Sequence, residues 1–198
     1  MKARFLLAAL ALMATPVLAA PVEVTRFHTP ESLTTLGRSA VAVIAVPGTD
    51  PASLETRVWL QAVEAELAAL RFGTATAGAA DAIAEVRVER EVQRTADHTG
   101  RQRGPVSIGV GGSTGGWNSG VGLGLGFNLG GGPKARIHTR LVVVIRSRAT
   151  GLSLWEGRVE NVEREKSKAA SVDVAAPRLA HALFSGFPGT SAATITVK

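Results

Sequence analysis

Cysteine and tyrosine are both absent from this chain of 198 residues. The absence of cysteine excludes disulfide bonds, thiolate zinc sites and thiol catalysis, and it excludes the acylated cysteine of bacterial lipoproteins. The absence of tyrosine removes a further acid–base side chain. Stability therefore has to come from burial of the hydrophobic residues, which make up 45% of the sequence. A chain of this length is sufficient for one domain with a substantial core.

Recognisable catalytic and cofactor-binding patterns are also missing. The residues Gly111–Gly115 match the letters of a serine nucleophile elbow, but glycine-rich sequence follows where that motif needs a helix. No glycine loop has the spacing of a nucleotide cradle. The histidines lie too far apart to predict a metal site. They are His28, His98, His138 and His181. The sequence therefore predicts a protein with no enzymatic activity, no cofactor and no metal.

The N-terminus has the three-part layout of a secretory signal peptide. Lys2 and Arg4 give it a positive start, an apolar run follows over Phe5–Ala14, and Pro16 ends that run. A membrane-spanning helix needs roughly 20 apolar residues, about twice the length of this run. We therefore expect a cleavable signal peptide and no transmembrane helix in the mature chain.

We place the cleavage site after Ala19, because a cut after Ala20 would leave Pro21 at the first position of the mature chain. The expected organisation is a signal peptide over residues 1–19 and a single α+β domain over residues 20–198. The net charge is +6, and the basic residues are interspersed with acidic ones, so we expect no nucleic-acid partner. We expect an exported, periplasmic protein, with peripheral association with the outer membrane as a further option.

Apolar periodicity predicts an α+β fold with one mixed, mostly antiparallel sheet of 4–6 strands and two helices on one of its faces. The first helix is expected over Ala52–Phe72, with a cap at Asp50–Pro51, an apolar stripe that includes Trp59, and Gly73 at its end. The second helix is expected over Val174–Phe187. The expected strands are Val22–His28, Ala40–Val46, Ala82–Val92, Ala135–Arg148 and Leu152–Val162, with Ala193–Val197 as an edge strand or a frayed tail.

The segment Gly104–Gly132 holds 13 of the 22 glycines in the chain. Apolar residues alternate with glycine in its second half, and each glycine in a strand interior costs roughly 0.5–1 kcal/mol relative to alanine. We interpret the segment either as a flexible insertion or as a long hairpin that extends the flanking strands. In either form, a dedicated role in membrane binding or assembly is a more specific version of the same interpretation. The candidate contacts with a partner or membrane are Trp117, Val121, Leu123, Leu125, Phe127 and Leu129.

Charged side chains alternate along the two strands that flank this insertion. If the two strands pair, acidic residues of the first face basic residues of the second, and the outer face of the sheet becomes a lattice of cross-strand ion pairs. These residues are Glu85, Glu89 and Glu91 before the insertion, and Arg136, His138 and Arg140 after it. Trp155, on the return strand beside Gly157, is expected in the core.

The order of several short motifs resembles the domain of unknown function 4136 family, a group of exported bacterial proteins. The motifs are an early strand ending near Phe27, Leu67–Gly73 ahead of Ala80–Asp81, Thr150–Gly151, Leu154–Gly157, and Phe187–Pro188. The resemblance implies an envelope location and an α+β fold, and it brings no catalytic residues. The chain departs from the lipoprotein pattern common in that family, because it lacks the acylated cysteine.

These observations favour an exported, non-catalytic binding or assembly module whose partner is an envelope protein, a polymer or a lipid surface. One alternative is a small periplasmic hydrolase that uses Ser113, His138 and an acid such as Glu89. Another is a structural homo-oligomer built through the glycine-rich ribbon.

Overall fold

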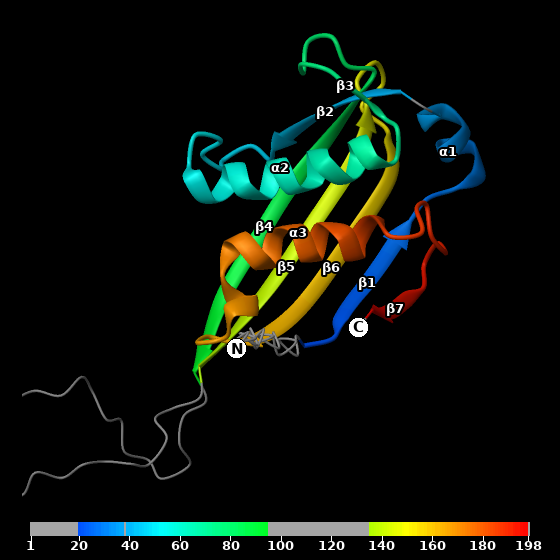
Figure 1. Cartoon of the computed structure of the whole chain (residues 1–198). Coiled ribbons are helices and arrows are strands. Elements are labelled where there is room, and N and C mark those ends of the chain that lie inside the picture. The colour runs from blue at the N-terminus through cyan, green and yellow to red at the C-terminus, as the bar shows by residue number, and fades with distance from the viewer. Residues whose placement is uncertain (1–19, 38, 95–134, 198) are drawn as a thin grey trace, which may run out of the picture.

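One mixed sheet organises the computed structural model, which describes residues 20–37, 39–94 and 135–197. Within these ranges, seven strands follow the order β3-β2-β4-β5-β6-β1-β7 (Figure 1). The strands are β1 (Val22–Phe27), β2 (Ala40–Ala45), β3 (Gly73–Thr74), β4 (Ala82–Arg94), β5 (Ala135–Ser147), β6 (Ser153–Arg164) and β7 (Thr194–Val197). The helices are α1 (Pro30–Leu36), α2 (Leu54–Ala69), the 3-10 helix η1 (Lys168–Ala170) and α3 (Val172–Phe184).

The predicted α+β class and the mostly antiparallel, mixed sheet are confirmed. Strand β2 runs parallel to β3 and β4, and the other neighbouring pairs are antiparallel. The predicted count of 4–6 strands is wrong, because the unexpected two-residue β3 adds a seventh strand at one edge; the tail forms the other edge as β7, one of the two options given for Ala193–Val197. Within the described part of the chain, three α-helices form instead of the two that were expected.

The helix missed by the sequence analysis is α1, which has seven residues. The Thr29 hydroxyl accepts a hydrogen bond from the Ser32 backbone N–H at 3.1 Å, and the Ser32 hydroxyl accepts one from the Thr29 N–H at 3.0 Å. This is a reciprocal capping box, and Pro30 occupies the first helical turn, where its missing N–H costs nothing. Threonine followed by proline is a start signal, but the helix is too short to show an apolar period.

Both predicted ends of α2 need correction. The N-cap is Ser53, not Asp50, since the Asp50 carboxylate accepts instead from the Ala52 N–H at 2.9 Å in the preceding turn. The helix ends before Leu70, and Arg71 has a φ of 66° that redirects the chain so that Gly73 already belongs to β3. At 16 residues, α2 is the longest helix in the described ranges. None of the helices there has the length and apolar character needed to cross a membrane.

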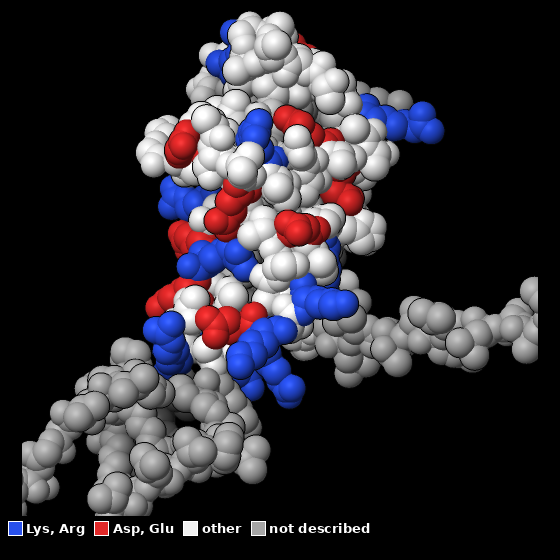
Figure 2. All heavy atoms as spheres, turned by 60° about the vertical axis from the view of Figure 1, so that its left-hand side comes forward, with Lys and Arg blue, Asp and Glu red and all other residues white. Residues whose placement is uncertain are grey.

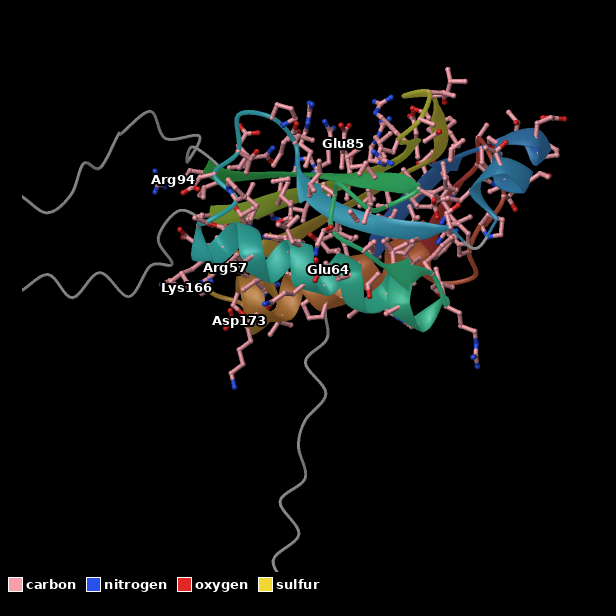
Figure 3. All side chains as sticks on the ribbon, turned by 90° about the horizontal axis from the view of Figure 1, so that it is seen from above. Arg57, Glu64, Glu85, Arg94, Lys166 and Asp173 are labelled. Atoms are coloured by element: carbon pink, nitrogen blue, oxygen red, sulfur yellow. The ribbon has the colours of Figure 1, made fainter. Side chains whose placement is uncertain are left out.

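Helices α2 and α3 lie across the same face of the sheet, as predicted (Figure 1). The apolar stripe of α2 is buried through Trp59, Val63 and Leu67, and it packs against alternate residues of β4 such as Val86. Trp155 is 0% exposed, which confirms its predicted core position, and its ring stacks on Phe184 of α3 with centroids 5.3 Å apart. The opposite, outer face of the sheet carries Glu85, which points away from α2 and α3 (Figure 3).

Candidate binding site

The partner contacts predicted from the sequence lie outside the described residues. This applies to Trp117, Val121, Leu123, Leu125, Phe127 and Leu129, and also to Ser113 of the hydrolase hypothesis. Their roles therefore stay predictions. The described part of the chain offers a different candidate, a cavity beneath the first turns of α2.

This helix-side cavity has a volume of about 210 Å³ and lies between α2, the preceding loop and β4. Its polar lining comes from the loop, from α2 and from Arg90 of β4, and its apolar lining is shared by α2 and β4. The lining residues are Thr49, Ser53, Glu55, Thr56, Trp59, Leu60, Val86, Val88 and Arg90. A typical site for a drug-sized ligand has about 300–1,000 Å³, so the cavity has room for one group of a ligand rather than a large molecule.

Strand periodicity explains why a charged residue lies at this cavity. Residues Val86, Val88 and Arg90 alternate along β4 on the face that α2 covers. The first two positions are apolar and follow the expected pattern, whereas the third places a guanidinium among core residues. Arg90 is held there by two partners, because it donates to Glu55 Oε1 at 3.3 Å and to the carbonyl oxygen of Ala170 in η1. The Arg90 side chain is 20% exposed.

Two buried donors at the cavity have no acceptor among the described residues. One is the indole N–H of Trp59, a residue that is 1% exposed, and the other is Nε of Arg90. A buried donor without a partner costs about 1–3 kcal/mol, so such groups in a native protein call for an explanation. Both residues line the same cavity, so these two donors are the candidate contacts for a ligand group that enters it.

The N-terminal end of α2 adds to this donor-rich character. Its N-cap Ser53 makes no capping hydrogen bond with its side chain, and the first N–H groups of a helix have no partner within the helix. Ser53, Glu55 and Thr56 of this first turn all line the cavity. The positive end of the helix dipole favours ligand oxygen atoms at this position.

The outer face of the sheet carries a lattice of ion pairs, but among the residues expected in it only Glu89 and Arg140 pair with each other. Arg140 binds Glu89 on β4 at 3.4 Å, as expected, and also binds Glu160 on β6 at 2.9 Å. His138 was expected to pair with β4 but contacts Glu160, at 3.3 Å. Glu85 pairs with Arg146 at 3.0 Å, rather than with Arg136, His138 or Arg140. Figure 2 shows acidic and basic side chains interspersed over the surface it presents, rather than gathered by sign.

A shallow hollow of about 350 Å³ lies within this lattice. Its floor is Val142 and Val144 of β5, and Arg87 and Arg158 lie on either side of Val142 in the sheet register. Its charged lining consists mainly of residues already engaged in ion pairs. Four arginines and two glutamates line the hollow, so its lining is positively charged, and Arg87 and Arg158 take part in none of the ion pairs found among the described residues.

Substitution of Arg140 with glutamine is expected to have a small, salt-dependent effect. The Arg140 side chain is 40% exposed, so the two ion pairs are screened by solvent, and the free energy of unfolding should fall by about 0.5–1 kcal/mol. Urea denaturation at low salt and at about 1 M salt measures this, and the difference should nearly vanish at high salt. A large loss that persists at high salt would contradict the interpretation of a solvated lattice.

The other residues of the hydrolase hypothesis are occupied elsewhere. Glu89 pairs with Arg140, and His138 pairs with Glu160. Over residues 20–37, 39–94 and 135–197, no group of three or more histidine, aspartate or glutamate side chains is arranged to hold a metal ion.

A family model described as a domain of unknown function, DUF4136, matches residues 41–189. The chain belongs to the DUF4136 family. No curated protein matches the chain. Among solved structures, the PelC dodecamer from Paraburkholderia phytofirmans is 13% identical with a TM-score of 0.42, covering 80% of this chain and 91% of that chain. A PDZ domain protein from Parabacteroides distasonis ATCC 8503 is 10% identical with a TM-score of 0.45, and the match covers 90% of this chain and 39% of that chain. Likeness at this level bears on neither ligand nor assembly.

The DUF4136 match confirms the resemblance drawn from the sequence motifs. It includes every residue that lines the helix-side cavity, from Thr49 to Arg90, whereas β1 and β7 lie outside it. The description of the family names no activity. The function of this DUF4136 member therefore has to be argued from its own side chains.

Sequence reasoning missed the helix-side cavity, although one signal was available. Arg90 follows Ala82, Ala84, Val86 and Val88 at the same parity, so it belongs to the apolar face of its strand. A charged residue at an apolar parity needs a buried partner or a ligand. Trp59 gave no such signal, because an indole on a helical stripe also fits an ordinary core position.

Proposed function

We propose that this chain is an exported, non-catalytic binding module of the cell envelope that takes a carbonyl-bearing ligand group into the helix-side cavity. The observation that carries the proposal is the pair of unpartnered donors, Trp59 Nε1 and Arg90 Nε, on residues that line one cavity. The export component is supported by the signal-peptide pattern of the N-terminus. The binding component is supported by the helix-side cavity alone.

The charges around the cavity favour a neutral ligand group. The Arg90 guanidinium is matched by the Glu55 carboxylate at 3.3 Å, so an incoming anion would meet a negative charge as well as a positive one. A carbonyl oxygen accepts hydrogen bonds without bringing a net charge, so it suits donors of this kind. The Glu55 side chain is 55% exposed, which places this end of the cavity at the surface, where the rest of a ligand can extend.

The remaining lining indicates a small apolar part next to that carbonyl. Leu60, Val86 and Val88 provide a hydrophobic wall, and the threonine hydroxyls provide further hydrogen-bonding groups. An acetamido group has this combination of a carbonyl oxygen, an N–H and a methyl group. N-acetylated sugars, which carry acetamido groups, are the ligand class that we propose.

The proposal predicts that Trp59→Phe weakens binding of N-acetylglucosamine about tenfold, because the phenyl ring keeps an aromatic, apolar side chain at this position but lacks the N–H donor. Saturation-transfer NMR titrations of the two proteins measure the change. Without ligand, the variant should lose about 1–2 kcal/mol of folding free energy, because the phenyl ring leaves part of the buried volume of the indole empty, so the affinities are compared on folded protein. Arg57→Gln is a matched control on α2, since Arg57 does not line the cavity.

Glucose serves as the ligand control, because it has hydroxyl groups but no acetamido group. Equal binding of both sugars, or equal affinities of the parent and Trp59→Phe, would overturn the assigned ligand class. If the cavity holds only water, neither sugar will bind. The homo-oligomer hypothesis depends on the glycine-rich segment and stays a separate prediction.

A further inference from the structure

A buried carboxylate lies where the mature N-terminus is expected. Glu163 is 6% exposed and projects from the inner face of β6, near the end of that strand. Its Oε1 atom accepts a hydrogen bond from the backbone N–H of Ala20 at 2.8 Å. The same oxygen accepts from Nη1 of Arg178 on α3 at 2.9 Å.

Arg178 closes a ring of three residues around this oxygen. Its Nη2 atom donates to the backbone carbonyl of Ala20, so Glu163 and Arg178 together bind both the N–H and the C=O of one residue. The position of Glu163 is unusual for a charged residue, because it lies on the core-facing side of β6 together with Trp155 and Val159. A charge that is withdrawn from water needs strong partners to offset its desolvation.

We propose that Glu163 is the binding site for the α-ammonium group that is created when the chain is cleaved after Ala19. In that step water adds across the Ala19–Ala20 peptide bond, so Ala19 leaves with a carboxylate and the Ala20 nitrogen becomes an amine that takes up a proton. A signal peptidase supplies the catalysis. Cleavage converts the neutral N–H donor at 2.8 Å from Glu163 into a cationic one.

The change strengthens the contact, because the carboxylate already makes the hydrogen bond charge-assisted and cleavage adds the Coulomb attraction of a positive charge at the donor. It also provides additional N–H donors at the same nitrogen. Asn161, two residues before Glu163 on the same strand face, is 4% exposed, and its side-chain amide has no partner among the residues described. Its register partner is Val22, which is two residues after Ala20, so the Asn161 Oδ1 atom is the acceptor that we assign to a second ammonium N–H.

This site goes beyond the helix-side cavity and the ligand proposed for it. It makes proteolytic processing a step that completes the fold, since the cation that partners Glu163 at Ala20 does not exist in the precursor. The site also fits only one position for the first residue of the mature chain. A mature chain that begins one residue earlier would move its ammonium group by about 3.8 Å, the distance between consecutive Cα atoms, and leave an ordinary amide at Ala20.

The test compares two forms of the processed chain that begin at Ala20, one with a free amine and one enzymatically acetylated at Nα. Acetylation removes the positive charge and leaves the sequence unchanged. We expect the acetylated form to have a folding equilibrium constant about tenfold lower in urea denaturation, equivalent to about 1.4 kcal/mol. In Glu163→Gln, acetylation should have almost no effect. The exposed residue Glu165 is the matched control, and Glu165→Gln should retain the full tenfold difference.

A chain that begins at Ala19 tests the same point without any substitution in the fold, which matters if Glu163→Gln does not fold. It should lose about the same tenfold factor. N-terminal sequencing of the protein purified from its own envelope should show Ala20 first. The inference is overturned if acetylation leaves stability unchanged, if it affects Glu163→Gln as much as the parent, or if the processed chain begins elsewhere. None of these outcomes depends on ligand binding at the helix-side cavity.

Discussion

Replacing Gly157 with alanine is expected to lower the free energy of unfolding by about 3 kcal/mol, although only one methyl group is added. A Cβ atom at this position would lie 2.3 Å from the Trp155 ring and 2.8 Å from Leu183. Trp155 cannot move aside easily, because its ring stacks on Phe184 and its indole N–H donates to the Pro188 carbonyl at 3.2 Å. Thermal unfolding should show a fall in Tm of about 6–12 °C.

Gly78→Ala is the matched control for this prediction. Gly78 lies in a turn, has no heavy atom within 4 Å of an added Cβ, and has no positive φ. Its substitution should change stability by less than about 0.5 kcal/mol. If Gly157→Ala were as stable as Gly78→Ala, the indole of Trp155 would have another place to pack, and the described core arrangement around it would be wrong.

The pair formed by Trp155 and Gly157 shows what the sequence could and could not predict. Alternating apolar residues predicted the hairpin of β5 and β6 and the core position of Trp155, because strand periodicity fixes which face a side chain occupies. The reason for glycine two residues later was not visible in that pattern. It depends on how far the indole extends along its own strand and on Leu183 from α3, which is distant in sequence.

The same limit explains the errors and omissions elsewhere. Long periodic segments were located correctly, whereas the two-residue β3 and the seven-residue α1 are too short for any period to appear. Arg90 and Glu163 each occupy a core-facing parity of a strand, so the sequence contained a sign of both sites. Their partners, Ala170 and Arg178, are brought to them only by the packing of η1 and α3 on the sheet.

Replacing Arg26 with methionine is expected to lower the free energy of unfolding by about 3–4 kcal/mol. Arg26 is 4% exposed and donates to three carbonyl oxygens at the end of α3, those of Ala182, Leu183 and Ser185, at 2.8–3.0 Å. The last carbonyls of a helix have no partner within the helix, and they form the negative end of its dipole. Burial lowers the pKa of Arg26 from its ordinary value, yet a guanidinium stays protonated. The group that donates to these carbonyl oxygens therefore carries a full positive charge.

Arg26→Lys separates the role of charge from that of geometry, because lysine keeps the cation but cannot reproduce the planar fork of donors. Urea denaturation should place it between the parent and Arg26→Met. Arg26 anchors the C-terminal end of α3 to β1, and Arg178 joins an earlier turn of α3 to Ala20 and to Glu163 of β6. The two arginines therefore fasten one helix to two neighbouring strands of the sheet. The acetylation effect at Ala20 should therefore be smaller in Arg26→Met than in the parent. Independent, additive effects would show that α3 does not couple the two sites.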